Sequence, residues 1–232
     1  MNDDCTVVIQ GPINKLLSKS IPKYLERYKV VLSSWEPENE EERNILNDAR
    51  SYNIEITLEK SKEYQWFNRS NIYRQSRTTL NGLYKVKTKF AVKVRTDCYF
   101  SELSNLIDKI EEDRLTITDI YMNYEYPFHI SDYILGSTRD SLLLTFTFLD
   151  ILCRFTPPCL KQYFPDHRWF GLNFVPTSEA LICSAYLRSK HIYPSLRDMV
   201  SQMNDNLILV PRDKLGKYIF TSNDRNETIS NE

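Results

Sequence analysis

The segment KFAVKVRTDCYF (residues 89–100) places apolar side chains at every second position and then ends on one carboxylate. The alternation of Phe90, Val92 and Val94 predicts a half-buried or inner β-strand. Asp97 follows this strand, and carboxylates at strand ends of an α/β sheet often face the crevice in which ligands bind. An aspartate is equally at home in a turn or at a helix cap, so the segment alone leaves both interpretations open.

Strands and helices alternate along the first half of the chain. Further strands are expected at residues 6–10, 29–33 and 54–58, and helices at residues 21–26, 36–51 and 71–83. This alternation predicts an α/β protein with a largely parallel sheet and crossover helices. The second half is less regular, with short strands expected near residues 117–122 and 207–210 and a buried helix at residues 142–153.

This order suits a single domain built from two halves. Residues 1–112 would bind a nucleotide and residues 113–222 an acceptor, followed by a polar tail at residues 223–232. The same order occurs in many other α/β proteins, so it does not fix the function.

The composition excludes several classes of protein. Of the 232 residues, 41% are hydrophobic and 26% are charged, and the formal net charge of −1 gives no case for binding nucleic acid. The five cysteines form no C-x-x-C pair, which favours neither a zinc site nor a disulfide framework. The apolar runs are too short for a transmembrane segment or a signal peptide, so a cytoplasmic protein is expected.

A basic block leads into the strand before Asp97. Residues 64–96 contain Lys and Arg but no Asp or Glu, directly after a strongly acidic stretch. This imbalance predicts an anionic ligand near the carboxyl end of the strand. A solvated basic face is the alternative, and it accounts for most of the lysines.

The predicted helix NIYRQSRTTLNGL (residues 71–83) has two distinct faces. Its apolar stripe, which packs on the sheet, consists of Ile72, Thr79, Leu80 and Leu83. Asn71, Arg74 and Thr78 lie three and four positions apart and share a neighbouring face. An arginine between two neutral hydrogen-bonding groups suits a phosphate or ribose clamp, although a polar surface stripe has the same pattern.

Arg95 and Asp97 alternate on one side of the strand. They form either an ordinary ion pair or a diphosphate site. In the second case Arg95 binds the phosphates and Asp97 binds a divalent cation that bridges them.

Five blocks occur in one order: VVIQGPI, VVLSSWE, NIYRQSRTTLNGL, KFAVKVRTD and SDYILGSTRDSL. They resemble the WavE family, which is implicated in lipopolysaccharide core synthesis and has related sequences in large DNA viruses. The resemblance extends from about Val7 to beyond Glu179. More distantly, the helix and the following strand resemble the asparagine-rich helix and acidic strand end of GT-A glycosyltransferases. That strand end usually carries Asp-x-Asp; here it is Arg-Thr-Asp, so only Asp97 fills the last acidic place and Arg95 stands at the first.

The resemblance implies a GT-A-like fold, a Rossmann-type mixed and mainly parallel sheet flanked by helices. It also implies a glycosyltransferase that moves a sugar from a nucleotide-sugar donor, expected to be a UDP-sugar, onto a glycan or glycolipid acceptor. Asp97 would contact a divalent cation, Mn²⁺ or Mg²⁺, or the sugar nucleotide itself. The expected location is the cytoplasm of a bacterium or of a virus-infected host cell.

By the same resemblance, Gln10, Gly11 and Pro12 line the nucleotide pocket, and Ser34 and Trp35 lie near the base. Gly11 would let the backbone approach the ligand closely. An ordinary Gly-Pro turn and a core tryptophan are the simpler alternatives.

The second half is expected to supply the general base that an inverting transfer needs. Glu179, at the start of an apolar helix, is the expected base, and Asp132 would orient the acceptor or stabilise a lid. Glu179 would also suit a helix start without any catalytic role, because a carboxylate there favours the helix dipole. His167 is either a second metal ligand or a polar loop residue.

Two other functions remain compatible with these residues. One is a catalytically inactive module of the same fold that binds sugar nucleotides or carbohydrates. The other is a nucleotidyltransferase or phosphoesterase at the same crevice, which would need a cluster of acids where the sequence offers Asp97.

Overall fold

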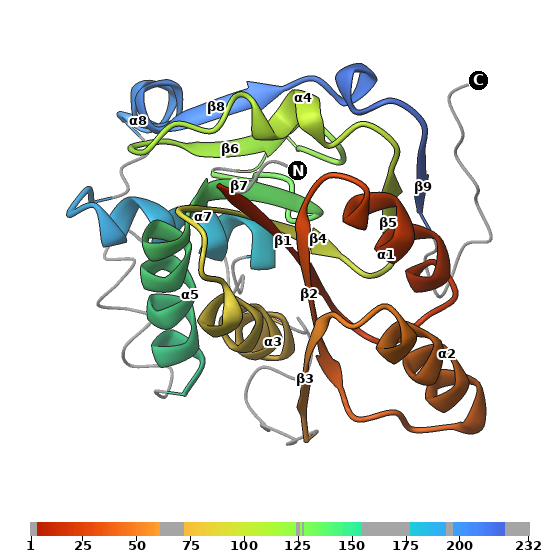
Figure 1. Cartoon of the computed structure of the whole chain (residues 1–232). Helices are drawn as coiled ribbons and strands as arrows, with labels where there is room; N and C mark the ends of the chain where they lie inside the picture. The colour runs from red at the N-terminus through yellow and green to blue at the C-terminus, as the bar shows by residue number, and fades with distance from the viewer. Residues whose placement is uncertain are drawn as a thin grey trace.

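Strand β1 (Cys5–Gln10) lies inside a mixed β-sheet whose two faces are covered by helices (Figure 1). The computed structural model describes residues 4–60, 72–123, 126, 128–154, 177–193 and 197–220. The strands are β1 (Cys5–Gln10), β2 (Lys29–Trp35), β3 (Glu55–Glu59), β4 (Phe90–Arg95), β5 (Cys98–Phe100), β6 (Leu115–Thr118), β7 (Ile134–Thr138), β8 (Leu207–Val210) and β9 (Tyr218–Phe220).

Within the described residues, seven strands form one sheet in the order β3-β2-β1-β4-β7-β6-β8. Neighbouring strands are parallel except for β7, which is antiparallel to both β4 and β6. Strands β5 and β9 pair separately as an antiparallel ribbon. The order β3-β2-β1-β4 is that of the first half of a Rossmann-type sheet, so the predicted α/β class and mainly parallel sheet are confirmed.

Helices pack on both faces of this sheet. They are α1 (Leu17–Leu25), α2 (Glu40–Ser51), α3 (Ile72–Lys85), α4 (Ser104–Ile107), α5 (Arg139–Arg154), α7 (Ser178–Ser189) and α8 (Met199–Asn206), with a 3₁₀ helix η2 at Arg212–Leu215. Helices α1 and α2 share one core with Val7 and Ile9 of β1, whereas α3, α5 and α7 share the other with Val8. Every residue of β1 is buried, as expected for a parallel strand covered on both faces.

Helix α3 packs unusually close to the sheet, which fixes its position over β1 and β2. A Cβ atom on Gly82 would lie 2.4 Å from Cγ1 of Val8 and 3.0 Å from Cβ of Ser33. Only glycine therefore permits this approach. Because α3 precedes β4 as a crossover helix, its first turns lie near the carboxyl ends of the parallel strands.

The predicted elements of the first half are confirmed to within a few residues. Helix α1 begins at Leu17 rather than at Ile21, so Pro22 lies inside the helix and not in its first turn, where proline is typical. In the second half, the strand expected near residues 117–122 ends at Thr118. Strands β5, β7 and β9 were not predicted, because each has at most five residues and β7 contains Gly136.

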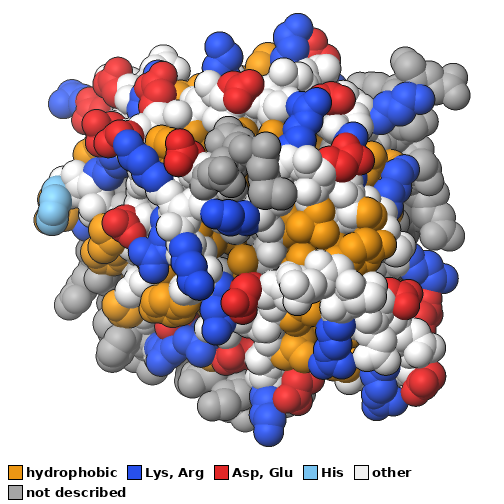
Figure 2. Space-filling model, viewed as in Figure 1, with side chains coloured by type: hydrophobic (Ala, Val, Ile, Leu, Met, Phe, Trp, Pro, Cys, Tyr) orange, Lys and Arg blue, Asp and Glu red, His pale blue; other side chains and the backbone are white. Residues whose placement is uncertain are grey.

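The surface in Figure 2 shows Lys and Arg side chains interspersed with Asp and Glu, in keeping with the near-zero net charge. Among the described residues, no helix has both the length and the apolar character needed to cross a membrane. The expected polar tail at residues 223–232 lies outside the described residues.

Candidate functional site

The carboxyl ends of β1 and β4 lie side by side at the point where the chain changes the direction in which it adds strands to the sheet. From β1 the chain continues through β2 and β3 on one side, whereas β4 lies on the other side. The register pairs Gln10, the last residue of β1, with Arg95, the last residue of β4. In open α/β sheets such a reversal opens a crevice that binds ligands, so the candidate site lies here.

Gly11 brings the two strand ends into close contact. Its φ of 138° lies in a region that side chains rarely adopt, and a Cβ atom there would lie 2.5 Å from Oγ1 of Thr96. The Gly11 carbonyl accepts a hydrogen bond of 2.7 Å from the hydroxyl of Ser34. Gly11 is thus required by the turn itself, and the exposed Pro12 follows it.

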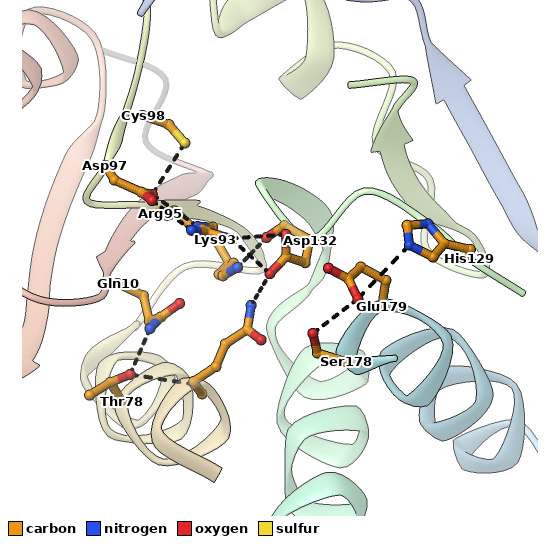
Figure 3. Close-up of polar contacts among 11 residues, drawn as sticks. Gln10, Thr78, Lys93, Arg95, Asp97, Cys98, His129, Asp132, Ser178 and Glu179 are labelled. Atoms are coloured by element: carbon orange, nitrogen blue, oxygen red, sulfur yellow. Dashed lines mark hydrogen bonds and ion pairs between the residues drawn. The ribbon is translucent and has the colours of Figure 1, made fainter. Parts of the chain in front are cut away.

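The guanidinium of Arg95 lies between two carboxylates (Figure 3). Its Nε and Nη2 donate to the two oxygens of Asp97 at 2.9 and 2.6 Å. Its Nη1 donates to both oxygens of Asp132 at 3.2 Å. The exposed fractions of the side chains are 31% for Arg95, 21% for Asp97 and 5% for Asp132, so Asp132 is the buried anchor and Asp97 the accessible partner.

Two further side chains hold Asp132 in place. The amide of Gln75, on α3, donates to Oδ2 of Asp132 at 2.8 Å. The ammonium of the fully buried Lys93, on β4, donates to the backbone carbonyl of Asp132. Asp132 therefore joins α3 and β4 to the segment that precedes β7.

The charges of this network determine its protonation. Burial alone would raise the pKa of Asp132, but the charges of Arg95 and Lys93 and the hydrogen bond from Gln75 outweigh it, so the pKa is lowered. Burial lowers the pKa of Lys93 to about 8, although Asp132 opposes this shift. Burial also acts to lower the pKa of Arg95, but Asp132 and Asp97 raise it well above its usual value. Asp132 is thus a charged carboxylate at neutral pH, with both oxygens engaged.

Gln10 and Thr96 contribute buried polar atoms that lack a hydrogen-bond partner within the described residues. The Gln10 amide nitrogen donates to the hydroxyl of Thr78 at 2.8 Å, which leaves Oε1 of Gln10 without a donor. Oγ1 of Thr96 also has no partner in the part of the chain that the structure describes. Because burial without a hydrogen bond is costly, these two atoms at the strand ends are available to a ligand or to water.

Arg74 and Trp35 extend the site toward β2. The guanidinium carbon of Arg74 lies 5.8 Å from the centroid of the Trp35 ring, within the range of a cation–π contact. The side chain of Arg74 is exposed, whereas Thr78, one turn later, is buried against Gln10. The expected polar face of α3 therefore lies over the ends of β1 and β2.

Glu179 lies in the first turn of α7, beside the segment that carries Asp132. Its Oε2 accepts a hydrogen bond of 3.0 Å from the hydroxyl of Ser178 and lies 4.0 Å from Nε2 of His129. In Figure 3 its other oxygen points toward Asp132. The helix is capped by Thr177, whose side chain accepts from the amide of Ala180 at 3.3 Å, and Glu179 lies in the first turn, where a carboxylate also favours the helix dipole.

A divalent cation fits this site only together with a phosphate ligand. Among the described residues, no group of three His, Cys, Asp or Glu side chains is placed to hold a metal ion. Asp97 is the accessible carboxylate, and both of its oxygens accept from Arg95. Mg²⁺ in nucleotide sites often binds through one or two carboxylates, substrate phosphates and water, and Asp97 suits that arrangement.

Two of the expected site residues, Asn71 and His167, lie outside the described residues. The structure also brings Gln75 and Lys93 into the site, and neither was predicted. Lys93 precedes Arg95 by two positions, so strand periodicity indicates that it shares the face of Arg95. Gln75 is adjacent to Arg74, but nothing in the helical pattern distinguishes it.

No curated protein sequence matches the chain. Among solved structures, HddC from Yersinia pseudotuberculosis matches with 12% sequence identity, over 60% of this chain and 78% of HddC, at a TM-score of 0.37. That likeness is too low to bear on function. The sequence profile of the WavE lipopolysaccharide synthesis family matches residues 5–207, which include every described residue of the candidate site. The chain belongs to the WavE lipopolysaccharide synthesis family.

Proposed function

We propose that the chain is a GT-A-like glycosyltransferase that moves a sugar from a nucleotide-sugar donor, a UDP-sugar, onto a glycan or glycolipid acceptor. The observation that carries this proposal is the Arg95 guanidinium, fixed by Asp132 at the switch point of the sheet and partly open to solvent. A positioned guanidinium suits the diphosphate of such a donor. Membership of a lipopolysaccharide synthesis family supports a sugar-related substrate.

The diphosphate of the donor would replace Asp97 as a hydrogen-bond partner of Arg95. Asp97 is more exposed than Asp132, and Asp132 is also held by Gln75. The exchange therefore leaves the buried half of the network intact. Asp97 would hold Mn²⁺ or Mg²⁺, which would supply charge neutralisation for the leaving diphosphate.

The nucleoside would lie toward β2. Trp35 and Arg74 provide an aromatic ring and a guanidinium at the end of that strand. The unpartnered Oε1 of Gln10 accepts a hydrogen bond from a base N–H or a ribose hydroxyl. Ser34, which is buried and donates its hydroxyl to the Gly11 carbonyl, would shape the turn next to the base.

Glu179 would act as the general base. Its Oε2 is oriented by Ser178, and its other oxygen accepts the proton of the acceptor hydroxyl as the new glycosidic bond forms. The bond between the sugar and the donor phosphate breaks, and the nucleoside diphosphate leaves. Asp132 is assigned a different role, because both of its oxygens accept hydrogen bonds: it positions Arg95.

The bidentate Arg95–Asp97 pair also favours a second candidate, an inactive module that binds sugar nucleotides. In that case the pair stays closed, Asp97 never receives a cation, and the donor is bound but not cleaved. Binding and turnover separate the two functions.

A donor screen tests the proposal directly. The wild-type protein is incubated with UDP-, GDP-, CMP- and dTDP-sugars and Mn²⁺, with an acceptor oligosaccharide released from lipopolysaccharide. Nucleotide release is measured, and donor binding is measured separately by calorimetric titration. The transferase proposal expects release from one donor class, loss of release in Asp97→Asn and Glu179→Gln, and normal release in Glu55→Gln. Glu55 is an exposed carboxylate at the opposite end of the sheet. Donor binding without release supports the inactive module, and neither binding nor release by any donor refutes both.

A further inference from the structure

Tyr121, Tyr133 and Phe220 form an aromatic platform beside the candidate site. Their ring centroids lie 5.3 Å apart for Tyr121 and Tyr133, 5.1 Å for Tyr133 and Phe220, and 5.8 Å for Tyr121 and Phe220. The rings come from the turn after β6, the segment before β7 and the end of β9. Three segments that are distant in sequence thus build one aromatic cluster, in which Tyr121 is exposed, Tyr133 is half-buried and Phe220 is buried.

The platform adjoins the Arg95–Asp97 pair. The guanidinium carbon of Arg95 lies 4.5 Å from the centroid of the Tyr133 ring. Phe220 pairs in the β5–β9 ribbon with Cys98, the residue that follows Asp97. The Tyr133 ring therefore contacts both the platform and Arg95, so a ligand on the platform lies next to the proposed diphosphate site.

Tyr121 is the open member of the platform and is held in an unfavourable conformation. Its side chain is 53% exposed, and its φ of 53° lies in the left-handed region that tyrosine rarely adopts. The amide of Met122 donates to the carbonyl of Asp119 at 3.2 Å, and the carboxylate of Asp119 accepts from the amide of Arg212 at 2.8 Å. The turn is thus closed by a backbone hydrogen bond and tied through Asp119 to Arg212, and it presents a bulky ring to solvent where glycine or asparagine would fit with less strain.

We propose that Tyr121 and Tyr133 bind a pyranose ring of the glycan acceptor. The inference deepens the proposed function and rests on it. One face of a pyranose consists of C–H groups, whereas its hydroxyls project from the rim. An exposed tyrosine ring covers that apolar face, and its own hydroxyl stays hydrated.

The position of the platform favours the acceptor over the donor nucleoside. Trp35 and Arg74, the groups proposed for the nucleoside, lie at the end of β2. The platform lies beyond the end of β4, and β1 separates β2 from β4 in the sheet. Arg95 at the end of β4 thus lies between the Trp35–Arg74 pair, in which Trp35 is largely buried and Arg74 exposed, and the platform. A donor and an acceptor that meet at one diphosphate require such an arrangement.

Variants at Tyr121 separate a binding role from a structural one. Tyr121→Asn removes the ring but suits the left-handed backbone, so its melting temperature should not fall. Tyr121→Phe keeps the ring. Tyr84→Asn is the matched control, because Tyr84 is an exposed tyrosine in the last turn of α3, at the other end of the sheet.

Saturation-transfer NMR provides the readout. The probes are methyl glycosides of glucose, galactose, mannose and heptose and the core oligosaccharide released from lipopolysaccharide by mild acid; UDP affinity is measured separately. The wild-type protein, Tyr121→Phe and Tyr84→Asn should saturate the ring C–H protons of at least one probe. Tyr121→Asn should bind that probe about fivefold more weakly, the range expected for one aromatic contact, with unchanged UDP affinity.

Equal sugar affinity in Tyr121→Asn and wild type overturns the inference. So does a wild-type protein that binds UDP but none of the sugar probes. Sugar binding that depends on Tyr121 in a protein that does not bind UDP supports the platform and refutes the proposed donor site, so the two failures are distinguishable.

Discussion

The guanidinium of Arg95 and the carboxylate of Asp97 meet through two nearly parallel hydrogen bonds, Nε to Oδ1 at 2.9 Å and Nη2 to Oδ2 at 2.6 Å. This pair closes the carboxyl end of β4, and Asp132 holds the remaining edge of the guanidinium. The fork geometry fixes the plane of Arg95, which a lysine ammonium would not do. We therefore propose distinct roles for the two carboxylates: Asp97 would be displaced by the donor phosphates, whereas Asp132 would keep Arg95 in position.

Asp132→Asn is expected to lower both the stability of the fold and its affinity for UDP. The substitution leaves Lys93 and Arg95 with less compensating charge, and the loss of one partner of a buried ion pair costs about 3 kcal/mol of unfolding free energy. Urea unfolding measures the first effect and calorimetric titration the second. Asp150→Asn is the control, because Asp150 is also buried and pairs with Arg154 at 2.7 Å, away from the site. It should lose stability but keep UDP affinity; equal UDP affinity in both variants would refute the positioning role of Asp132.

Lys93→Met is expected to change how stability depends on pH. The folded pKa of Lys93 is about 8, whereas the unfolded value is about 10.4. Between these values the unfolded state binds more protons, so the contribution of Lys93 to stability is complete above pH 10.4 and is lost as pH falls through 8.

The unfolding free energy of wild type minus that of Lys93→Met should therefore rise by about 2 kcal/mol from pH 7 to pH 10. Burial raises the pKa of buried cysteines and tyrosines of the folded protein above this range, so these groups titrate here only in the unfolded chain. Their contribution is common to both proteins and cancels in the difference. Urea unfolding at each pH gives the values. A difference that stays constant across this range would show that Lys93 is not a buried cation.

Glu179→Gln is expected to abolish turnover without weakening donor binding. The substitution keeps the shape and the contact with Ser178 but removes the proton acceptor, so kcat should fall about 100-fold or more. The Kd for UDP should stay the same. Ser178→Ala, which removes only the orienting hydroxyl, should cause a smaller loss. A Glu179→Gln enzyme with wild-type kcat would rule out this base.

Asp97→Asn is expected to remove the effect of Mn²⁺ on UDP affinity. In the wild-type protein, Mn²⁺ and UDP should bind cooperatively, because the cation is held jointly by a carboxylate and the phosphates. In the variant, the UDP titration curves with and without Mn²⁺ should coincide. If Mn²⁺ strengthens UDP binding equally in both proteins, Asp97 is not the cation ligand.

Much of the fold was predictable because the first half follows strict periodicities. The buried strands β1, β2 and β4 are apolar and separated by amphipathic helices, and Asp97 lies two residues after Arg95, the last residue of β4. The second half was less predictable. Strand β7 has five residues and is paired antiparallel to β4, a pairing that depends on contacts from distant sequence.

Lys93 and Gln75, the two side chains that hold Asp132 in place, were not predicted for the same reason. Lys93 belongs to a block of lysines that are mostly exposed, and its burial depends on the segment around Asp132, 39 positions later. Gln75 likewise acquires its role only when α3 meets that segment. The unfavourable φ of Tyr121 leaves no trace in composition or periodicity.

The measurement that tests the central claim most directly is a comparison of UDP with uridine on the wild-type protein and on Arg95→Lys. Arg43→Lys, at an exposed ion pair on α2, is the control. The account predicts that wild type and Arg43→Lys bind UDP at least about 100-fold more tightly than uridine, and that Arg95→Lys loses most of this difference while its uridine affinity stays the same. UDP and uridine binding with equal affinity to the wild-type protein, or a preference for UDP that Arg95→Lys retains in full, would contradict a diphosphate site at Arg95.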